Sequence, residues 1–139
     1  MLVLDIPIKK GPTYKVSKHF ILQFVKRTGL KYNNAKFIKN IQKSIRSSYW
    51  VQRGPSSAVH AILNNNFHEA RYFYNPSADM VFVLEREGDK VTGPFNVLVT
   101  FYKGSDSSWI PDWKRKTPNE KRISWETYIE KGEDAFQLL

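Results

Sequence analysis

Apolar residues recur every three to four positions in two segments near the start of the chain, which is the period of an α-helix. The first predicted helix covers residues 18–28, with Ser17 as its N-cap and Gly29 as its C-terminal stop. The second is expected from Ala35 to Tyr49, after a cap at Asn33-Asn34. Both segments are long and periodic enough to predict two packed helices.

After a third short helix, expected over residues 54–66, the apolar period changes from 3.6 to 2, which indicates β-strands. Three strands are predicted, over residues 69–74, 80–85 and 95–103. Turn residues separate the first two strands at positions 75–79. Consecutive strands with short turns predict an antiparallel meander.

Alternation along these strands divides their side chains between two faces. On the last strand, the face expected to be core contains Phe95, Val97, Val99 and Phe101. The opposite face, the expected floor of a site, contains Asn96, Leu98, Thr100 and Tyr102. On the first strand, Arg71 and Phe73 share one face, opposite Tyr72 and Tyr74.

Helices followed by a meander predict an α+β fold, with the N-terminal helices packed on one face of an antiparallel sheet. We expect one domain over residues 1–139, with a core at about 17–103 and a C-terminal extension at 104–139. Within the extension, residues 124–137 are expected to form a short helix broken near Gly132. Its acidic residues would fold back across the basic half of the chain or remain solvated.

Composition narrows the class of protein. The 139 residues include no cysteine, which excludes disulfides, thiolate metal sites and cysteine nucleophiles. No apolar run approaches the roughly 20 residues needed to span a bilayer, and the first residues do not form a signal peptide. We therefore expect a cytoplasmic protein with no membrane partner.

Charge is distributed very unevenly along the chain. The net charge is +9, but residues 1–54 hold 12 Lys and Arg against a single acid, Asp5. Residues 55–139 hold 10 bases and 12 acids. A basic half beside a nearly neutral half is typical of a protein that binds a polyanion, although charge alone is also compatible with a merely soluble basic protein.

The second predicted helix contains most of this charge on one side. Its polar face contains Lys36, Lys39, Lys43 and Arg46, and the helix has no acid to pair with them. Such a row is either a solvated face or a phosphate-binding surface. Because unpaired like charges repel one another along a helix, we favour the second interpretation.

Several kinds of site are absent from the sequence. The three histidines lack the spacing of metal ligands, and there is no glycine-rich phosphate loop and no nucleophile elbow. We therefore expect no metal and no cofactor. The remaining His, Arg, Lys, Tyr and Thr side chains are those that a metal-free ribonuclease requires, since it needs a base, an acid and a cation to stabilise the phosphate.

His19 is the first candidate base. It lies in the first turn of its helix, where the helix dipole favours the neutral imidazole that a base requires. A surface histidine beside a cap is an equally good interpretation. The strand tyrosines are likewise open to two interpretations, because they can stack on bases or pack across strands.

Two groups of residues resemble a known class of ribonuclease. Ser17-Lys18-His19, followed by Lys26-Arg27-Thr28-Gly29, resembles the opening helix of small RelE-like and RegB-like toxins and phage ribonucleases. Residues 70–76, 81–83 and 97–102 resemble their strand meander. The resemblance covers about residues 17–103 and places the chain in the superfold shared by barnase, EndoU and RelE.

This resemblance implies metal-independent cleavage of RNA by attack of the 2′-hydroxyl. It implies His19 as base or acid, Arg27 and Arg71 as phosphate clamps, Thr100 as a phosphate hydrogen-bond donor, and Tyr74 or Tyr102 as a stacking or proton-donating group. Gln23 departs from the pattern, which has a basic residue at that position. The wider RNA-binding surface is expected to consist of Lys26, Lys36, Lys39, Lys43, Arg46 and Lys103.

Three functions therefore follow from the sequence. The first is a metal-independent endoribonuclease, of toxin or phage type, that cleaves RNA. The second is a non-catalytic nucleic-acid-binding protein that uses the basic N-terminal half. The third is an interaction protein whose basic face binds an acidic partner, such as an antitoxin or immunity protein.

Overall fold

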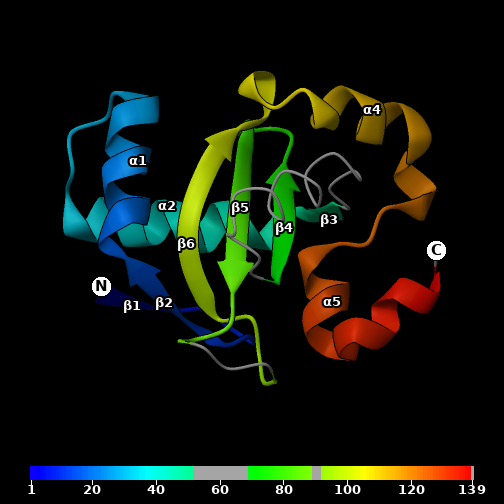
Figure 1. Ribbon diagram of the computed structural model, residues 1–139, viewed down its shortest axis with the longest axis horizontal. Helices are drawn as coiled ribbons and strands as arrows, with labels where there is room; N and C mark the ends of the chain where they lie inside the picture. Colours follow the sequence, from blue (N-terminus) through cyan, green and yellow to red (C-terminus); the bar gives the residue numbers. More distant parts are fainter. Residues whose placement is uncertain (52–68, 89–91, 139) are drawn as a thin grey trace.

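The computed structural model describes residues 1–51, 69–88 and 92–138, so the helix expected over residues 54–66 lies outside the described residues. The fold is α+β and is built on one sheet of six strands in the order β1-β2-β6-β5-β4-β3. Figure 1 shows β4, β5 and β6 side by side at the centre of the molecule. The strands are β1 (Leu2–Pro7), β2 (Thr13–Ser17), β3 (Tyr49–Val51), β4 (Ala70–Asn75), β5 (Met80–Glu85) and β6 (Val97–Lys103).

The sheet is mixed rather than wholly antiparallel. Strands β4, β5 and β6 form the expected antiparallel meander, and β3, which the sequence did not predict, pairs with β4 in the antiparallel sense. The hairpin of β1 and β2, which the sequence did not predict, then adds to the other edge of β6, and β2 runs parallel to β6. As a result, β6 lies between β2 of the N-terminal hairpin and β5 of the meander.

Helices α1 (Lys18–Thr28) and α2 (Asn34–Arg46) share one apolar core with the sheet, and Figure 1 shows α2 behind the strands and α1 beside β6. Helix α1 has the predicted bounds, since Ser17 caps Phe20 N and Gly29 ends the helix with a left-handed φ of 71°. Helix α2 begins as expected at an Asn33 cap but ends three residues before Tyr49, which belongs to β3. Phe20, Phe24, Phe37, Ile41 and Ile45 of the two helices enter the main core.

A further helix, α4 (Trp109–Lys116), was not predicted and lies on the opposite face of the sheet. Its Ile110 and Trp113 form a second apolar cluster with Val51, Tyr74 and Val81. Tyr74 and Val81 are paired across β4 and β5 and point away from Phe73 and Phe82, which belong to the main core. Helices therefore contribute to both apolar clusters. The sequence-based prediction placed helices on one face of the sheet and included no helix in the second cluster.

The remaining helical segments are short. Residues Gly104–Asp106, Asn119–Lys121 and Gly132–Leu138 form the 3₁₀ turns η1, η2 and η3, and α5 covers Trp125–Lys131. The break at Gly132 agrees with the sequence prediction. Trp125, Tyr128 and Ala135 belong to the main core, as do Ile6 and Tyr14 of the N-terminal hairpin. The core consequently extends beyond residues 17–103 at both ends.

One predicted face assignment is wrong because β6 contains a bulge. Val83 of β5 pairs with Thr100, but the next residue of β5, Leu84, pairs with Leu98, so Val99 has no partner in that ladder. An unpaired residue reverses the alternation on one side of the bulge. Leu98 is therefore completely buried in the main core, whereas Val99 is only partly buried.

Within the described residues, no helix is both long and apolar enough to cross a membrane.

Candidate functional site

The basic row on α2 is positioned by a cap at the start of the helix and by two hydrogen bonds that join the helix to the sheet. Asn33 accepts a hydrogen bond from Lys36 N at 3.1 Å and starts the helix. Near the other end, the buried Asn75 donates to the Ser44 carbonyl at 2.8 Å, which ties α2 to β4. Gln42 donates to the Pro7 carbonyl at 2.7 Å, which ties it to β1. The orientation of the row is therefore fixed by the sheet.

Lys36, Lys39, Lys43 and Arg46 are all exposed, as the sequence predicted. At 1.5 Å of rise per residue, the row extends for about 15 Å along α2. Among the residues that the structure describes, none of the four forms an ion pair. Five cations on other elements do pair with carboxylates: Lys15, Arg71, Arg86, Arg115 and Lys116.

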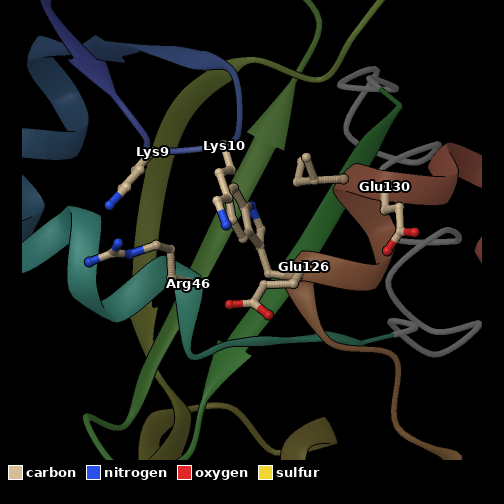
Figure 2. A pocket seen from close by; sticks show the side chains of 7 residues that line it. Lys9, Lys10, Arg46, Glu126 and Glu130 are labelled. Carbon is tan, nitrogen blue, oxygen red and sulfur yellow. The ribbon is translucent and has the colours of Figure 1, made fainter.

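Two further cations extend the row beyond α2. Lys9 and Lys10 belong to the turn of the β1–β2 hairpin, and together with Arg46 they line one pocket (Figure 2). Both lysines are exposed and, within the described chain, unpaired. Sequence reasoning missed them, although a Lys-Lys pair just before Gly11-Pro12 is the signal that would place two cations at a turn. We call Lys9, Lys10, Lys36, Lys39, Lys43 and Arg46 the basic surface.

The predicted catalytic residues are not brought together in one place. His19 is exposed in the first turn of α1, and Arg27 lies eight residues later, about 12 Å further along the helix axis. Arg71 points to the main-core side of the sheet, since it pairs with Leu84 of β5, which is buried in the main core. Tyr74 and Tyr102 lie on the opposite side of the sheet. Tyr74 is part of the second apolar cluster, and Tyr102 packs against it.

Arg27, Tyr102 and Thr100 do form a local group. The Arg27 guanidinium lies over the Tyr102 ring, 4.8 Å from its centroid, and donates to the Phe101 carbonyl. Thr100 is half-buried, two residues earlier on the same strand, so it shares a face with Tyr102. This group contains a cation, a phenol and a hydroxyl, and His19 lies about 12 Å from Arg27 along the axis of α1.

Arg71 is neutralised by carboxylates rather than exposed to a ligand. It lies 3.0 Å from Glu69 and 2.8 Å from Glu133, and its guanidinium is 4.3 Å from the centroid of the Phe95 ring. Arg86 also pairs with Glu69, and the two arginines lower the pKa of that carboxyl, with the hydrogen bond from Arg86 as the largest cause. In this arrangement two carboxylates balance the charge of Arg71.

Tyr74 is 2% exposed, with its ring against Trp113 at a centroid distance of 5.9 Å. Its hydroxyl lies 3.4 Å from an oxygen of Asp79. The ring is therefore a packing residue that no base can reach in this conformation. Lys26, which is exposed on α1, and Lys103, which is half-buried at the end of β6, lie on other elements than the α2 row.

Within the described residues, no group of three His, Asp or Glu side chains could hold a metal ion. Comparison of the chain with protein-family models, with curated proteins and with solved structures found no match.

Proposed function

We propose that this protein binds single-stranded nucleic acid, RNA in particular, through the basic surface. The observation that supports this most directly is the row of exposed α2 cations that have no acidic partner in the described chain. Aligned like charges repel one another, and a phosphate backbone relieves that repulsion while releasing its own counterions. The firm attachment of α2 to the sheet keeps the row in place without the ligand.

The experiment compares two triple variants of equal charge. Lys36→Gln, Lys39→Gln and Lys43→Gln remove the middle of the basic surface. Lys114→Gln, Lys116→Gln and Lys121→Gln remove three exposed cations from α4 and η2. Binding of a labelled single-stranded RNA is measured by fluorescence anisotropy, and helix content by circular dichroism. The α2 variant should bind at least about tenfold more weakly than the wild type, whereas the control should change little.

Equal losses in both variants would mean that net charge, rather than this surface, drives binding. Absence of RNA binding by the wild type at low salt would refute the proposal. The α2 variant is expected to fold, because removing like charges from one face of a helix relieves repulsion.

Metal-independent RNA cleavage is a second candidate function, and the stacked Arg27 and Tyr102 beside Thr100 favour it. The candidate rests on the resemblance of residues 17–103 to the barnase, EndoU and RelE superfold, and in this chain α1 and α2 precede the β4–β6 meander. A shared fold does not establish a shared activity. The candidate is tested by incubating total RNA with the protein in EDTA, beside His19→Ala and Arg27→Ala. Discrete cleavage by the wild type that both variants lack would support this candidate. Intact RNA would refute it, and nucleic-acid binding would then be the remaining proposal.

A further inference from the structure

A pocket of about 560 Å³ lies at the end of the basic surface, between the β1–β2 turn, the last turn of α2 and one side of α5. Sites for small molecules commonly occupy roughly 300–1,000 Å³, so this volume is sufficient for one nucleotide. It is lined by Lys9, Lys10, Arg46, Trp125, Glu126, Ile129 and Glu130.

The pocket contains charged groups of both signs. Figure 2 shows the charged ends of Lys9 and Arg46 on one side, Glu130 on the opposite side, and Glu126 between them in this view. Glu126 and Glu130 are four residues apart on α5. In the part of the chain that the structure describes, neither glutamate forms an ion pair with the three cations. The pocket therefore presents cations and carboxylates that have not neutralised each other.

The wall formed by Trp125 is rigid. Its indole N–H donates to the buried Tyr14 hydroxyl at 2.8 Å, and Trp125 is 2% exposed. A Cβ at Gly11 would lie 2.7 Å from the Trp125 ring, so the hairpin turn approaches this wall as closely as glycine allows. Lys10 has a φ of 62°, in the left-handed region that lysine rarely adopts. Such strained backbone positions are enriched at binding sites.

Resting on the proposed function, we infer that this pocket is a nucleotide subsite that selects bases carrying an exocyclic amine. Lys9, Lys10 and Arg46 hold the phosphate, because they continue the row on α2. The carboxylates of Glu126 and Glu130 accept hydrogen bonds from the amine, as carboxylates do from cytosine N4. Uracil has an oxygen at the same position, so it presents an acceptor to two further acceptors.

The test uses homo-oligomers of cytidine and of uridine of equal length, whose bases differ in the C4 substituent and in the hydrogen that uracil carries on N3. Their affinities are measured by fluorescence anisotropy for the wild type, for Glu126→Gln/Glu130→Gln, and for the control Asp106→Asn/Glu120→Gln. All four residues are exposed, and the two variants change the net charge equally. The wild type should bind the cytidine oligomer about fivefold to tenfold more tightly.

The ratio of the affinity for the cytidine oligomer to that for the uridine oligomer should fall close to one in the Glu126→Gln/Glu130→Gln variant. The reason is that a glutamine amide can donate to uracil as well as accept from cytosine. The ratio should persist in the control, which excludes a general effect of charge. Equal binding of both oligomers by the wild type, or loss of the ratio in the control as well, would overturn the subsite and leave the proposed function standing. If neither oligomer binds, the proposed function fails, and the subsite fails with it.

Discussion

At the scale of single residues, two buried tyrosines connect α5 and η3 to the rest of the fold. Tyr14 accepts the Trp125 indole N–H inside the core, and burial raises the pKa of Tyr14 above its ordinary value. Tyr128 packs edge-on against Phe73, with its hydroxyl 3.4 Å from Glu133. Burial, with a smaller contribution from the Glu133 carboxylate, raises the pKa of Tyr128 to about 12.

The Tyr128 shift predicts a loss of stability in alkali. The unfolded chain releases this phenolic proton near its ordinary pKa of 10.0, whereas the folded protein retains it to about pH 12. Between these values the unfolded state binds fewer protons, so the free energy of unfolding falls as pH rises. Urea denaturation at pH 9 and pH 11 should show a smaller fall for Tyr128→Phe than for the wild type. Tyr32→Phe, at an exposed ring, is the control. The same fall in all three proteins would contradict the assignment.

At the scale of elements, Ser17 joins α1 to the centre of the sheet. Its hydroxyl oxygen accepts from Phe20 N–H at 3.0 Å, and its O–H donates to the Val99 carbonyl at 2.8 Å. Two residues further along β6, Arg27 donates to the Phe101 carbonyl. Carbonyls two residues apart point to the same edge of a strand, and β2 has already ended at Ser17. The first and last turns of α1 thus satisfy the part of the β6 edge that no strand covers.

This double role predicts that Ser17→Ala is more costly than the equivalent change at the other N-cap. Asn33→Ala removes a cap alone and should lower the free energy of unfolding by about 1 kcal/mol. Ser17→Ala also leaves the Val99 carbonyl unpaired beside a buried position, so about 2–3 kcal/mol is expected. Chemical denaturation of both variants provides the comparison. Equal costs would show that the bond to Val99 contributes nothing.

The elements that the sequence predicted well carry their own local signals. Helix α1 is bounded by a serine cap and a glycine stop, and β5 lies between two turns rich in Gly, Pro and Asp. The hairpin of β1 and β2 also has local signals, since Leu4, Ile6 and Ile8, and then Tyr14 and Val16, alternate with other residues around the Gly11-Pro12 turn, but the sequence-based prediction did not include it. Helix α4 has only Ile110 and Trp113 as buried anchors, and no side chain caps its start.

The exposure of the basic row could be predicted because it depends on one helix, whereas the surroundings of the candidate catalytic residues depend on long-range packing. The periodicity of α2 alone identifies Lys36, Lys39 and Lys43 as one exposed row. By contrast, three other features depend on residues that are distant in sequence. They are the bulge at Val99, the packing of Trp113 on Tyr74 and the ion pair of Arg71 with Glu133. No local pattern reports such contacts.

At the scale of the whole molecule, the six exposed cations of the basic surface predict that binding depends steeply on salt. Release of counterions from single strands gives a slope of about −0.7 per neutralised phosphate in a plot of log affinity against log salt. Six cations in the basic surface therefore predict a slope of about −4 for the wild type. The Lys36/Lys39/Lys43→Gln protein retains three and should give about −2. Anisotropy titrations at several salt concentrations measure both slopes. Equal slopes for the wild type and the triple variant would show that the bound strand lies away from Lys36, Lys39 and Lys43.

The central position of β6 affects how the chain is made. Among the described strands, β6 alone connects the β1–β2 hairpin to β3, β4 and β5, yet it is the last strand in the sequence. A ribosome therefore exposes two separate sheet fragments, each with an open edge, until residue 103 has left the exit tunnel. Because these fragments present the edges that β6 later joins, neighbouring nascent chains on one messenger can pair with each other instead. Slow synthesis of the segment before β6 would favour such mispairing, so the rate of translation there bears on the yield of folded protein.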